Sequence, residues 1–387
     1  MWRELKPKAQ ATPLIYLDHL ASTPLDPKVR SAMLPWFTAA ATGNPHAEHG
    51  AGWRAAAAVE EARTSVAALL GVRPAEIVFT SGATEANNLA LFGLAADVDA
   101  VVVSAIEHPS ILEPAAALRA RGKTVGVLPT DGDGWVDLDR LDRWLARGRT
   151  LVSIMAANNE IGTLQPMAEI GALCRSHGAI FHTDAVQALS TQVMEIERAA
   201  IDALSLSGHK LYGPAGIGAL FIRTGMPCQP LVFGGGQQGG LRPGTLPVAL
   251  CVGFGEACRL ALTRRDEDRR HMAVLRDRLF AALNDGCLGV QRNGPATEAI
   301  PGCLNITLPG IDAADLLLDL PGLAVATGSA CATLAGAPSH VLRAIGLSAE
   351  QAHGSLRFGL GRGTTEADID TAAAQIIAAL RDRGRPR

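Results

Sequence analysis

The chain has 387 residues, of which 48% are hydrophobic and 19% are charged, and its formal net charge is −3. This composition is typical of a globular protein with a large core, and it lacks the basic excess of a nucleic-acid-binding chain. The longest apolar stretch, at residues 89–96, is too short to span a membrane, and residues 1–13 contain no apolar segment of a secretory signal. We therefore expect a cytoplasmic protein that binds neither nucleic acid nor membranes.

Strand-like and helix-like patterns alternate along residues 70–225. Short runs rich in β-branched and apolar residues occur at 76–80, 100–104, 124–128, 151–156, 179–183, 203–207 and 218–222. Helical periodicity separates several of them, at 83–96, 111–121 and 167–177. Such alternation predicts an α/β fold in which a mostly parallel sheet is flanked by helices.

The pattern changes after a glycine-rich stretch at residues 234–240. Residues 248–283 predict one or two long helices, and the remainder mixes helices with short strands such as 304–307. We expect a large domain over residues 15–260. A smaller α/β domain is expected to combine residues 1–14 with 261–387.

Three polar clusters follow predicted strands, where ligands gather in open α/β sheets. The first, TSGATE at 80–85, opens a helix, so its free N–H groups could bind an anion, although a plain N-cap explains it too. The second places Asp184 at a strand end, either as a turn residue or as a buried partner for a cationic nitrogen. The third places Lys210 between Gly208 and Gly213; it is either a surface lysine or a desolvated amine that reacts with an aldehyde.

A fourth cluster surrounds one of the seven cysteines. No two cysteines have the CxxC spacing, so neither a disulfide framework nor a zinc site is expected, and a small buried side chain is the default interpretation. Cys331 stands in the small-residue segment GSACAT at 328–333, which is typical of an exposed loop, although a buried side chain explains this cysteine equally well.

The first three clusters together contain the groups that one cofactor requires for binding. Pyridoxal 5'-phosphate requires a carboxylate for its pyridine nitrogen, a lysine for its aldehyde and a site for its phosphate. Asp184, Lys210 and the helix start at 80–85 supply these groups in an order compatible with a single sheet.

The sequence resembles the cysteine desulfurases, a branch of the fold-type I pyridoxal-phosphate enzymes related to class V aminotransferases. The resemblance covers nearly the whole chain. It is carried by YLD at 16–18, ASTP at 21–24, GNP at 43–45, TSGATEANN at 80–88, EH at 107–108, NNEIG at 158–162, HTDAVQ at 182–187, SGHKLYGP at 207–214, RPGT at 242–245 and RFGLGR at 357–362.

This resemblance implies a role for each matching residue. Lys210 is implied to bond the cofactor aldehyde, Asp184 to pair with the pyridine nitrogen, and Gln187 to bind the phenolic oxygen. His108 is implied to stack on the ring and is the best candidate acid or base for deprotonating the nucleophilic thiol. Phosphate binding is implied for Ala83, Thr84, Ser207 and His209. Binding of the substrate carboxylate is implied for Asn159 and Arg357.

The resemblance also implies partners. Thr245 resembles a residue that reaches the phosphate of a second subunit, which implies a homodimer with shared active sites. Cys331 matches the nucleophile of the branch with the longer catalytic loop, so it would take sulfur from L-cysteine as a persulfide and release alanine. An acceptor, such as an iron–sulfur scaffold protein, would then receive the sulfur. No resident metal is expected, although Cys331 could contact an iron–sulfur cluster during transfer.

Some positions depart from the family pattern, among them Cys303, Ala332 and the uncharged stretch 237–240, and they leave the sulfur acceptor open. A selenocysteine lyase of the same family is the nearest alternative function. An ordinary aminotransferase and a non-catalytic sulfur carrier are the others. A nicotinamide site at residues 234–236 is disfavoured, because these glycines do not open a helix after a strand.

Overall fold

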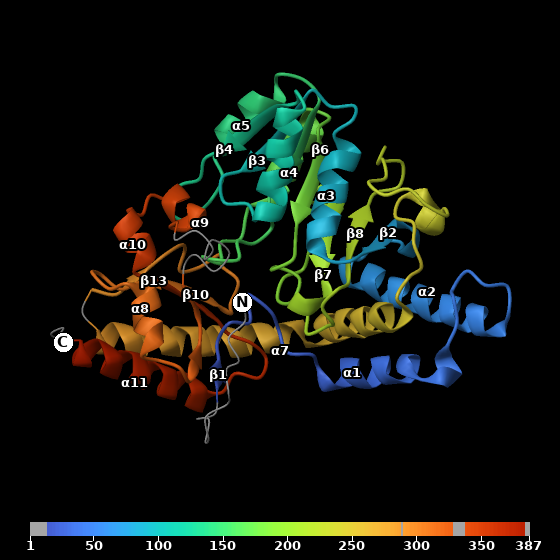
Figure 1. The fold of residues 1–387 in the computed structure, drawn as a ribbon. Helices are drawn as coiled ribbons and strands as arrows, with labels where there is room; N and C mark the ends of the chain where they lie inside the picture. The colour runs from blue at the N-terminus through green and yellow to red at the C-terminus, as the bar shows by residue number, and fades with distance from the viewer. Residues whose placement is uncertain (1–13, 288, 328–336, 384–387) are drawn as a thin grey trace.

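The computed structural model describes residues 14–287, 289–327 and 337–383, which form two larger sheets and one two-stranded sheet (Figure 1). The larger sheet has seven strands in the order β2-β8-β7-β6-β5-β3-β4. β8 runs opposite to the other six strands, so the predicted mostly parallel sheet is confirmed. The strands are β2 (Ile77–Thr80), β3 (Ala100–Ser104), β4 (Thr124–Leu128), β5 (Thr150–Ser153), β6 (Ile180–Asp184), β7 (Ala203–Ser207) and β8 (Gly218–Ile222).

Helices cover both faces of this sheet. On one face, α3 (Ala83–Leu94) and α4 (Pro109–Ala120) pack against alternate strand residues such as Val101 and Leu220. On the other face, residues such as Val102 and Phe181 form a second core with the opposite set of helices. That set comprises α2 (Gly50–Leu70), α5 (Leu138–Leu145), α6 (Met167–Ser176) and the first part of α7 (Val248–Gly286), with α1 (Pro27–Met33) beside α7. The fully buried strands are apolar on both faces because both faces are covered.

A smaller unit surrounds the second sheet, which has four antiparallel strands in the order β12-β13-β10-β9. Its core joins the second part of α7 to the strands and α11 through Leu279, Ile306, Phe358 and Ile376. The elements are β9 (Gln291–Arg292), β10 (Cys303–Thr307), α8 (Ala313–Leu318), β12 (Ala326–Thr327), α9 (His340–Ala344), α10 (Ala349–His353), β13 (Ser355–Gly359) and α11 (Glu366–Asp382), with β1 (Ile15–Tyr16) paired to β11 (Leu323–Ala324). Short 3₁₀ turns are η1 (Leu34–Phe37), η2 (Ala39–Ala41), η3 (Pro74–Glu76), η4 (Gly208–Lys210) and η5 (Gln237–Gly240).

One continuous helix connects the two units. The 39 residues of α7 run beneath both sheets (Figure 1), where the sequence had allowed one or two helices. The predicted domain boundary at residue 260 falls inside this helix, and the division of the chain into domains stays a prediction. Among the described helices, none has the length and apolar character needed to cross a membrane.

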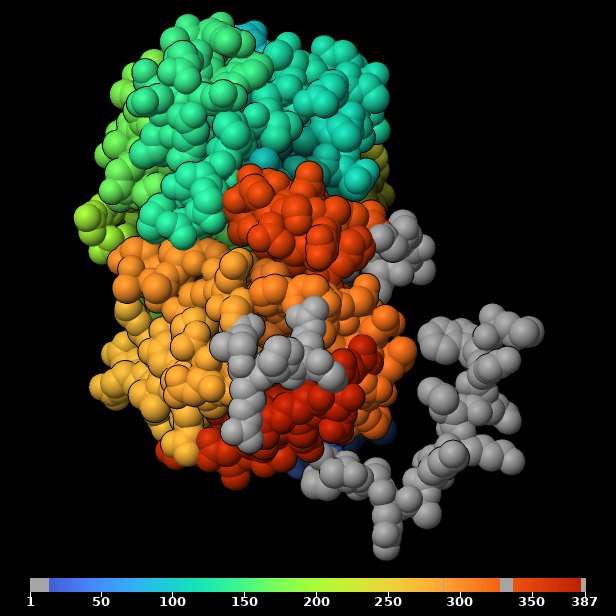
Figure 2. Space-filling view, turned by 90° about the vertical axis from the view of Figure 1, so that its left-hand side faces the viewer, coloured from blue at the N-terminus to red at the C-terminus, as the bar shows by residue number. Residues whose placement is uncertain are grey.

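The two units also meet through α9 and α10. Val341, Leu342 and Ile345 form a small apolar cluster with Ile106 and Met155, which lie just beyond the ends of β3 and β5. Figure 2 shows this orange-red block of the chain pressed against the green and teal part of the larger unit. The contact places the smaller unit at the carboxyl ends of the parallel strands, where the functional site lies.

Candidate active site

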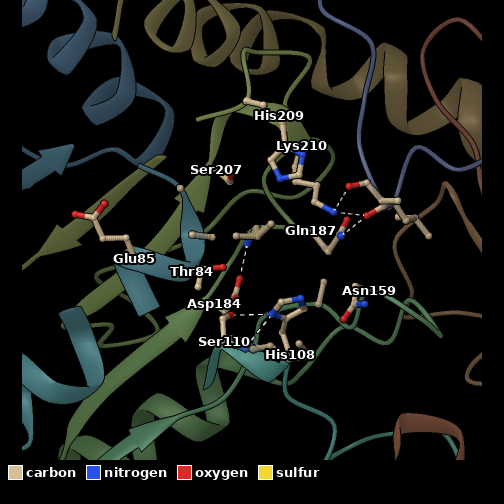
Figure 3. Close-up of a pocket in the computed structure, with 18 of the residues that line it drawn as sticks. Thr84, Glu85, His108, Ser110, Asn159, Asp184, Gln187, Ser207, His209 and Lys210 are labelled. Atoms are coloured by element: carbon tan, nitrogen blue, oxygen red, sulfur yellow. Dashed lines mark hydrogen bonds between the residues drawn. The ribbon is translucent and has the colours of Figure 1, made fainter. Parts of the chain in front are cut away.

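A cavity of about 460 Å³ opens at the carboxyl ends of the large sheet's strands (Figure 3). It brings together ten of the twelve residues singled out from the sequence: Ala83, Thr84, His108, Asn159, Asp184, Gln187, Ser207, His209, Lys210 and Arg357. Thr245 is exposed and does not line the cavity. Cys331 and its segment 328–333 lie outside the described residues.

The start of α3 forms one end of the cavity. Its N-cap, Gly82, has a φ of 151°, a conformation that favours glycine, and Ala83 and Thr84 are the first residues of the helix. The first N–H groups of a helix have no partner within it and carry a partial positive charge. Together with Ser207, which ends β7, this turn can bind a phosphate-like anion.

His209 lies beside this end of the cavity. Its Nδ1 is 3.2 Å from the hydroxyl oxygen of Ser22. Burial, helped by the nearby positive charge of Lys210, lowers the pKa of His209 to about 4. The imidazole is therefore neutral at neutral pH and acts as a hydrogen-bonding group rather than as a cation.

Asp184 is the last residue of β6 and is almost fully buried. Its Oδ1 accepts a hydrogen bond from the backbone N–H of Val186 (3.0 Å), and its Oδ2 accepts one from Nδ2 of Asn87 (2.7 Å). The same Asn87 nitrogen lies 2.8 Å from the hydroxyl oxygen of Ser110, which contacts Nδ1 of His108 at 2.8 Å. A buried carboxylate held in this way can pair with a cationic ring nitrogen.

Lys210 enters the cavity from η4, directly after β7. Its ammonium donates hydrogen bonds to the backbone carbonyls of Leu20 and Ala21. Gln187 donates to the same Leu20 carbonyl at 2.9 Å. The N-terminal segment at residues 20–21 therefore lies against the amine of Lys210, which is drawn with its hydrogen bonds in Figure 3.

Arg357 reaches the cavity from the smaller unit, in the middle of β13. Its side chain is 3% exposed; Nη2 pairs with Oδ1 of Asp18 at 2.8 Å, and Nη1 donates to the Asn159 carbonyl at 3.1 Å. Its buried Nε has no hydrogen-bond partner. Because buried polar groups are normally paired, a carboxylate from a ligand is the natural complement of this fork.

Two buried carboxyl groups lie behind the cavity and were not assigned a role from the sequence. Burial raises the pKa of Glu107 to about 8, although the Ser104 hydroxyl (2.5 Å) and the Met155 N–H (2.9 Å) bind its Oε1. Burial likewise raises the pKa of Glu160 to about 7, and its Oε2 accepts from the Ser339 hydroxyl at 2.5 Å. Both groups are partly protonated near neutral pH.

Sequence reasoning also missed Asn87 and Ser110. Asn87 lies within the motif at 80–88, one turn after Thr84, but no role was predicted for it. Ser110 follows His108 by two residues at the start of α4. The only sequence signal for either was proximity to a residue already singled out, since their hydrogen bonds join α3, α4 and β6.

Comparisons with known proteins show the family of the chain. The family model described as aminotransferase class-V matches residues 15–371. A mitochondrial cysteine desulfurase from Drosophila melanogaster is 44% identical over 94% of this chain and 80% of its own length. The cysteine desulfurase IscS from Rickettsia bellii is 43% identical over 95% of this chain and 91% of its own.

Solved structures give the same result for the fold. A NifS-like protein superposes with a TM-score of 0.89 at 34% identity, covering 95% of this chain and 100% of its own. A structure described as SspA in complex with cysteine superposes with a TM-score of 0.80 at 35% identity, covering 90% of this chain and 99% of its own.

Proposed function

Because the chain belongs to the class V aminotransferase family, and within it to the cysteine desulfurases, we propose that it removes sulfur from L-cysteine and releases L-alanine. Pyridoxal 5'-phosphate is the cofactor, and Cys331 holds the sulfur as a persulfide for an acceptor. The observation that carries the proposal is one cavity that joins a lysine, a buried carboxylate and a helix N-terminus to a carboxylate-binding arginine.

The residues present fit this cofactor. Lys210 supplies the amine, Asp184 the partner for a ring N–H, and the free N–H groups at the start of α3 the phosphate site. His108 lines the cavity beside Asp184 and is the candidate to cover the ring face, and Gln187 the candidate donor to its phenolic oxygen. When bound, pyridoxal phosphate acts as an electron sink that acidifies the α-carbon of an amino acid.

The protein's own residues place the substrate and handle its proton. Arg357 offers its unpaired Nε and its Nη groups to the substrate carboxylate, with Asn159 beside it. Nζ of Lys210 lies at the cavity edge, where it can take the α-proton and return a proton to the product. Asp18 fixes the guanidinium, so the carboxylate is held in one orientation.

The sulfur step follows from the chemistry of Cys331. Its thiolate attacks the sulfur of the bound cysteine, so a sulfur–sulfur bond forms and the carbon–sulfur bond breaks. The bonding electrons stay with the carbon skeleton, which takes up protons and leaves as alanine, and the enzyme keeps a persulfide. The described chain resumes beside the cavity, where Ser339 binds Glu160 and His340 lies 2.9 Å from the Glu107 carbonyl, which supports delivery of Cys331 to this site.

The proposal extends to partners. A homodimer with shared sites is supported by Thr245, which is exposed three residues after Arg242, while Arg242 pairs with Glu85 at the cavity rim (2.7 Å). From the family resemblance, we propose an iron–sulfur scaffold protein as the acceptor and the cytoplasm as the compartment.

The test is turnover of L-cysteine by Cys331→Ser with the cofactor bound. We expect alanine release to fall to background while the cofactor absorbance is unchanged. Cys228→Ser is the control, because Cys228 is a half-buried free thiol outside the cavity. Full-rate sulfide release by Cys331→Ser would refute the role of Cys331. Glutamate-dependent amino transfer, or turnover of selenocysteine but not cysteine, would favour the other family activities.

A further inference from the structure

A hydrogen-bonded chain runs from Asp184 through Asn87 and Ser110 to His108, and it determines which nitrogen of His108 carries a proton. Asp184 is the fixed point of the chain because an ionised carboxylate only accepts hydrogen bonds. The Asn87 atom that faces it at 2.7 Å must therefore be the amide nitrogen. This orientation leaves the Asn87 carbonyl oxygen buried without a partner, so the contact with Asp184 outweighs that loss.

The second amide hydrogen of Asn87 continues the chain. The Asn87 nitrogen lies 2.8 Å from the Ser110 oxygen, which therefore accepts a hydrogen bond from it. A hydroxyl has one hydrogen to donate, and the partner within reach is Nδ1 of His108 at 2.8 Å. Ser110 is 7% exposed, so water is a poor competitor for this hydrogen.

A second donor points at the same imidazole nitrogen. His108 is the N-cap of the twelve-residue helix α4, and its Nδ1 accepts the backbone N–H of Ser110 at 3.1 Å. Nδ1 therefore receives two hydrogen bonds and sits at the positive end of a helix. Both features disfavour a proton on Nδ1.

We propose that Asn87 and Ser110 are positioning residues that hold His108 with its single proton on Nε2, so that His108 presents an N–H donor to the cavity. In Figure 3 the other ring nitrogen lies on the side of His108 away from Ser110. A lone pair on Nε2, which a base would need, requires the Nδ1–H form. That form loses the hydrogen bond from the Ser110 backbone N–H and reverses the one with the Ser110 hydroxyl. His108 thus stabilises a thiolate or other electronegative group by hydrogen bonding instead of removing the thiol proton.

The charges around His108 leave this assignment intact. Burial lowers the pKa of His108, and Lys210 and His340 lower it further, while Asp184 opposes them. The neutral imidazole therefore prevails at neutral pH. The role toward the thiolate rests on the proposed function, whereas the position of the proton follows from the hydrogen bonds alone.

The experiment is nitrogen-15 NMR of the histidine-labelled full-length holoenzyme, with the His108 signals assigned by their loss in His108→Gln. We expect the wild type to show the Nε2–H form. Ser110→Ala removes one donor to the neutral ring, so the pKa of His108 should rise by about half to one pH unit, and Ser110→Thr should restore it. Asn88→Ala, a change in the neighbouring asparagine whose amide binds the Thr84 carbonyl, should leave the His108 signals unchanged.

Kinetics separate this inference from the proposed function. In Ser110→Ala the acid limb of kcat/KM for L-cysteine should move to higher pH by the same amount as the NMR-derived pKa, with the cofactor absorbance unchanged. An Nδ1–H form in the wild type, or unchanged His108 signals in Ser110→Ala, would overturn the inference. An inactive wild type that shows the expected tautomer would instead refute the desulfurase function.

Discussion

The two units of the molecule contribute to the cavity in different ways. The residues we call the sheet wall, namely His108, Asp184 and Lys210 with Asn87 and Ser110, all come from the larger unit. Asp184 ends a strand, His108 and Lys210 lie just after strands, and hydrogen bonds link four of the five. The residues we call the bridge, namely Arg357, Ser339 and His340, come from the smaller unit and are held by contacts to the larger one. The cofactor half of the site is thus built within one unit, and the substrate half depends on how two units meet.

The largest effect should come from the sheet wall. Lys210→Ala removes the amine that bonds the cofactor and moves the α-proton, so turnover of L-cysteine should fall about 1000-fold or more. Borohydride reduction should no longer fix the cofactor to the chain. Lys28→Ala, on an exposed turn of α1, is the matched control and should keep both properties. Near-normal turnover by Lys210→Ala would contradict the assignment.

Glu107, the buried neighbour of His108 in the chain, allows a test of the larger unit through the pH dependence of stability. Its pKa is raised from an ordinary 4.5 to about 8, so between these values the folded state holds a proton that the unfolded chain releases. Wild-type stability should therefore decline as pH rises from 4.5 to 8. Each unit corresponds to about 1.4 kcal/mol, so the decline should amount to several kcal/mol.

Glu107→Gln should lack this part of the decline. The measurement is denaturant unfolding of both proteins at pH 5.5, 7 and 8.5. The contribution of Glu160, which has the same sign, is present in both and cancels in the difference. Parallel stability curves for the two proteins would show that Glu107 is not protonated in the fold.

A smaller effect is expected where the bridge binds substrate. Arg357→Ala should raise KM for L-cysteine about 10- to 100-fold, because charge-assisted hydrogen bonds to the substrate carboxylate are lost. The cofactor absorbance should be retained. Arg357→Lys should recover only part of it, because an ammonium lacks the planar fork. Arg343→Ala is the control, since this arginine binds the Leu347 carbonyl and does not line the cavity. A pure kcat effect would place Arg357 outside substrate binding.

The smallest effect concerns how the bridge is attached. Ser339 and Ser348 both cap short helices, but only Ser339 also binds Glu160. Ser348→Ala should lower the free energy of unfolding by about 1 kcal/mol, because an N-cap hydrogen bond is lost. Ser339→Ala should lower it by about 1 kcal/mol more, because the hydrogen bond to Glu160 is lost as well. Equal losses in the free energy of unfolding for the two variants would mean that the contact with Glu160 does not stabilise the fold.

The sheet wall was easier to predict from the sequence than the bridge. Alternating strand and helix patterns located six of the large sheet's seven strands to within a residue, and the motifs containing Thr84, Asp184 and Lys210 marked strand ends. The sequence could not show that Asn87 and Ser110 connect Asp184 to His108, because these contacts join residues up to 97 positions apart. The pairing of Arg357 with Asp18 could not be predicted either, because it depends on how β13 packs beside the segment that follows β1.

The central claim is that sulfur moves from L-cysteine to Cys331 in the cavity formed by these two units. The most direct measurement is a single turnover of reductant-free holoenzyme with one equivalent of L-cysteine, followed by peptide mass spectrometry and alanine quantification. We expect a gain of one sulfur atom on the peptide containing Cys331, with alanine formed in equal amount. Alanine release with no sulfur on that peptide, or sulfur on another cysteine, would contradict it.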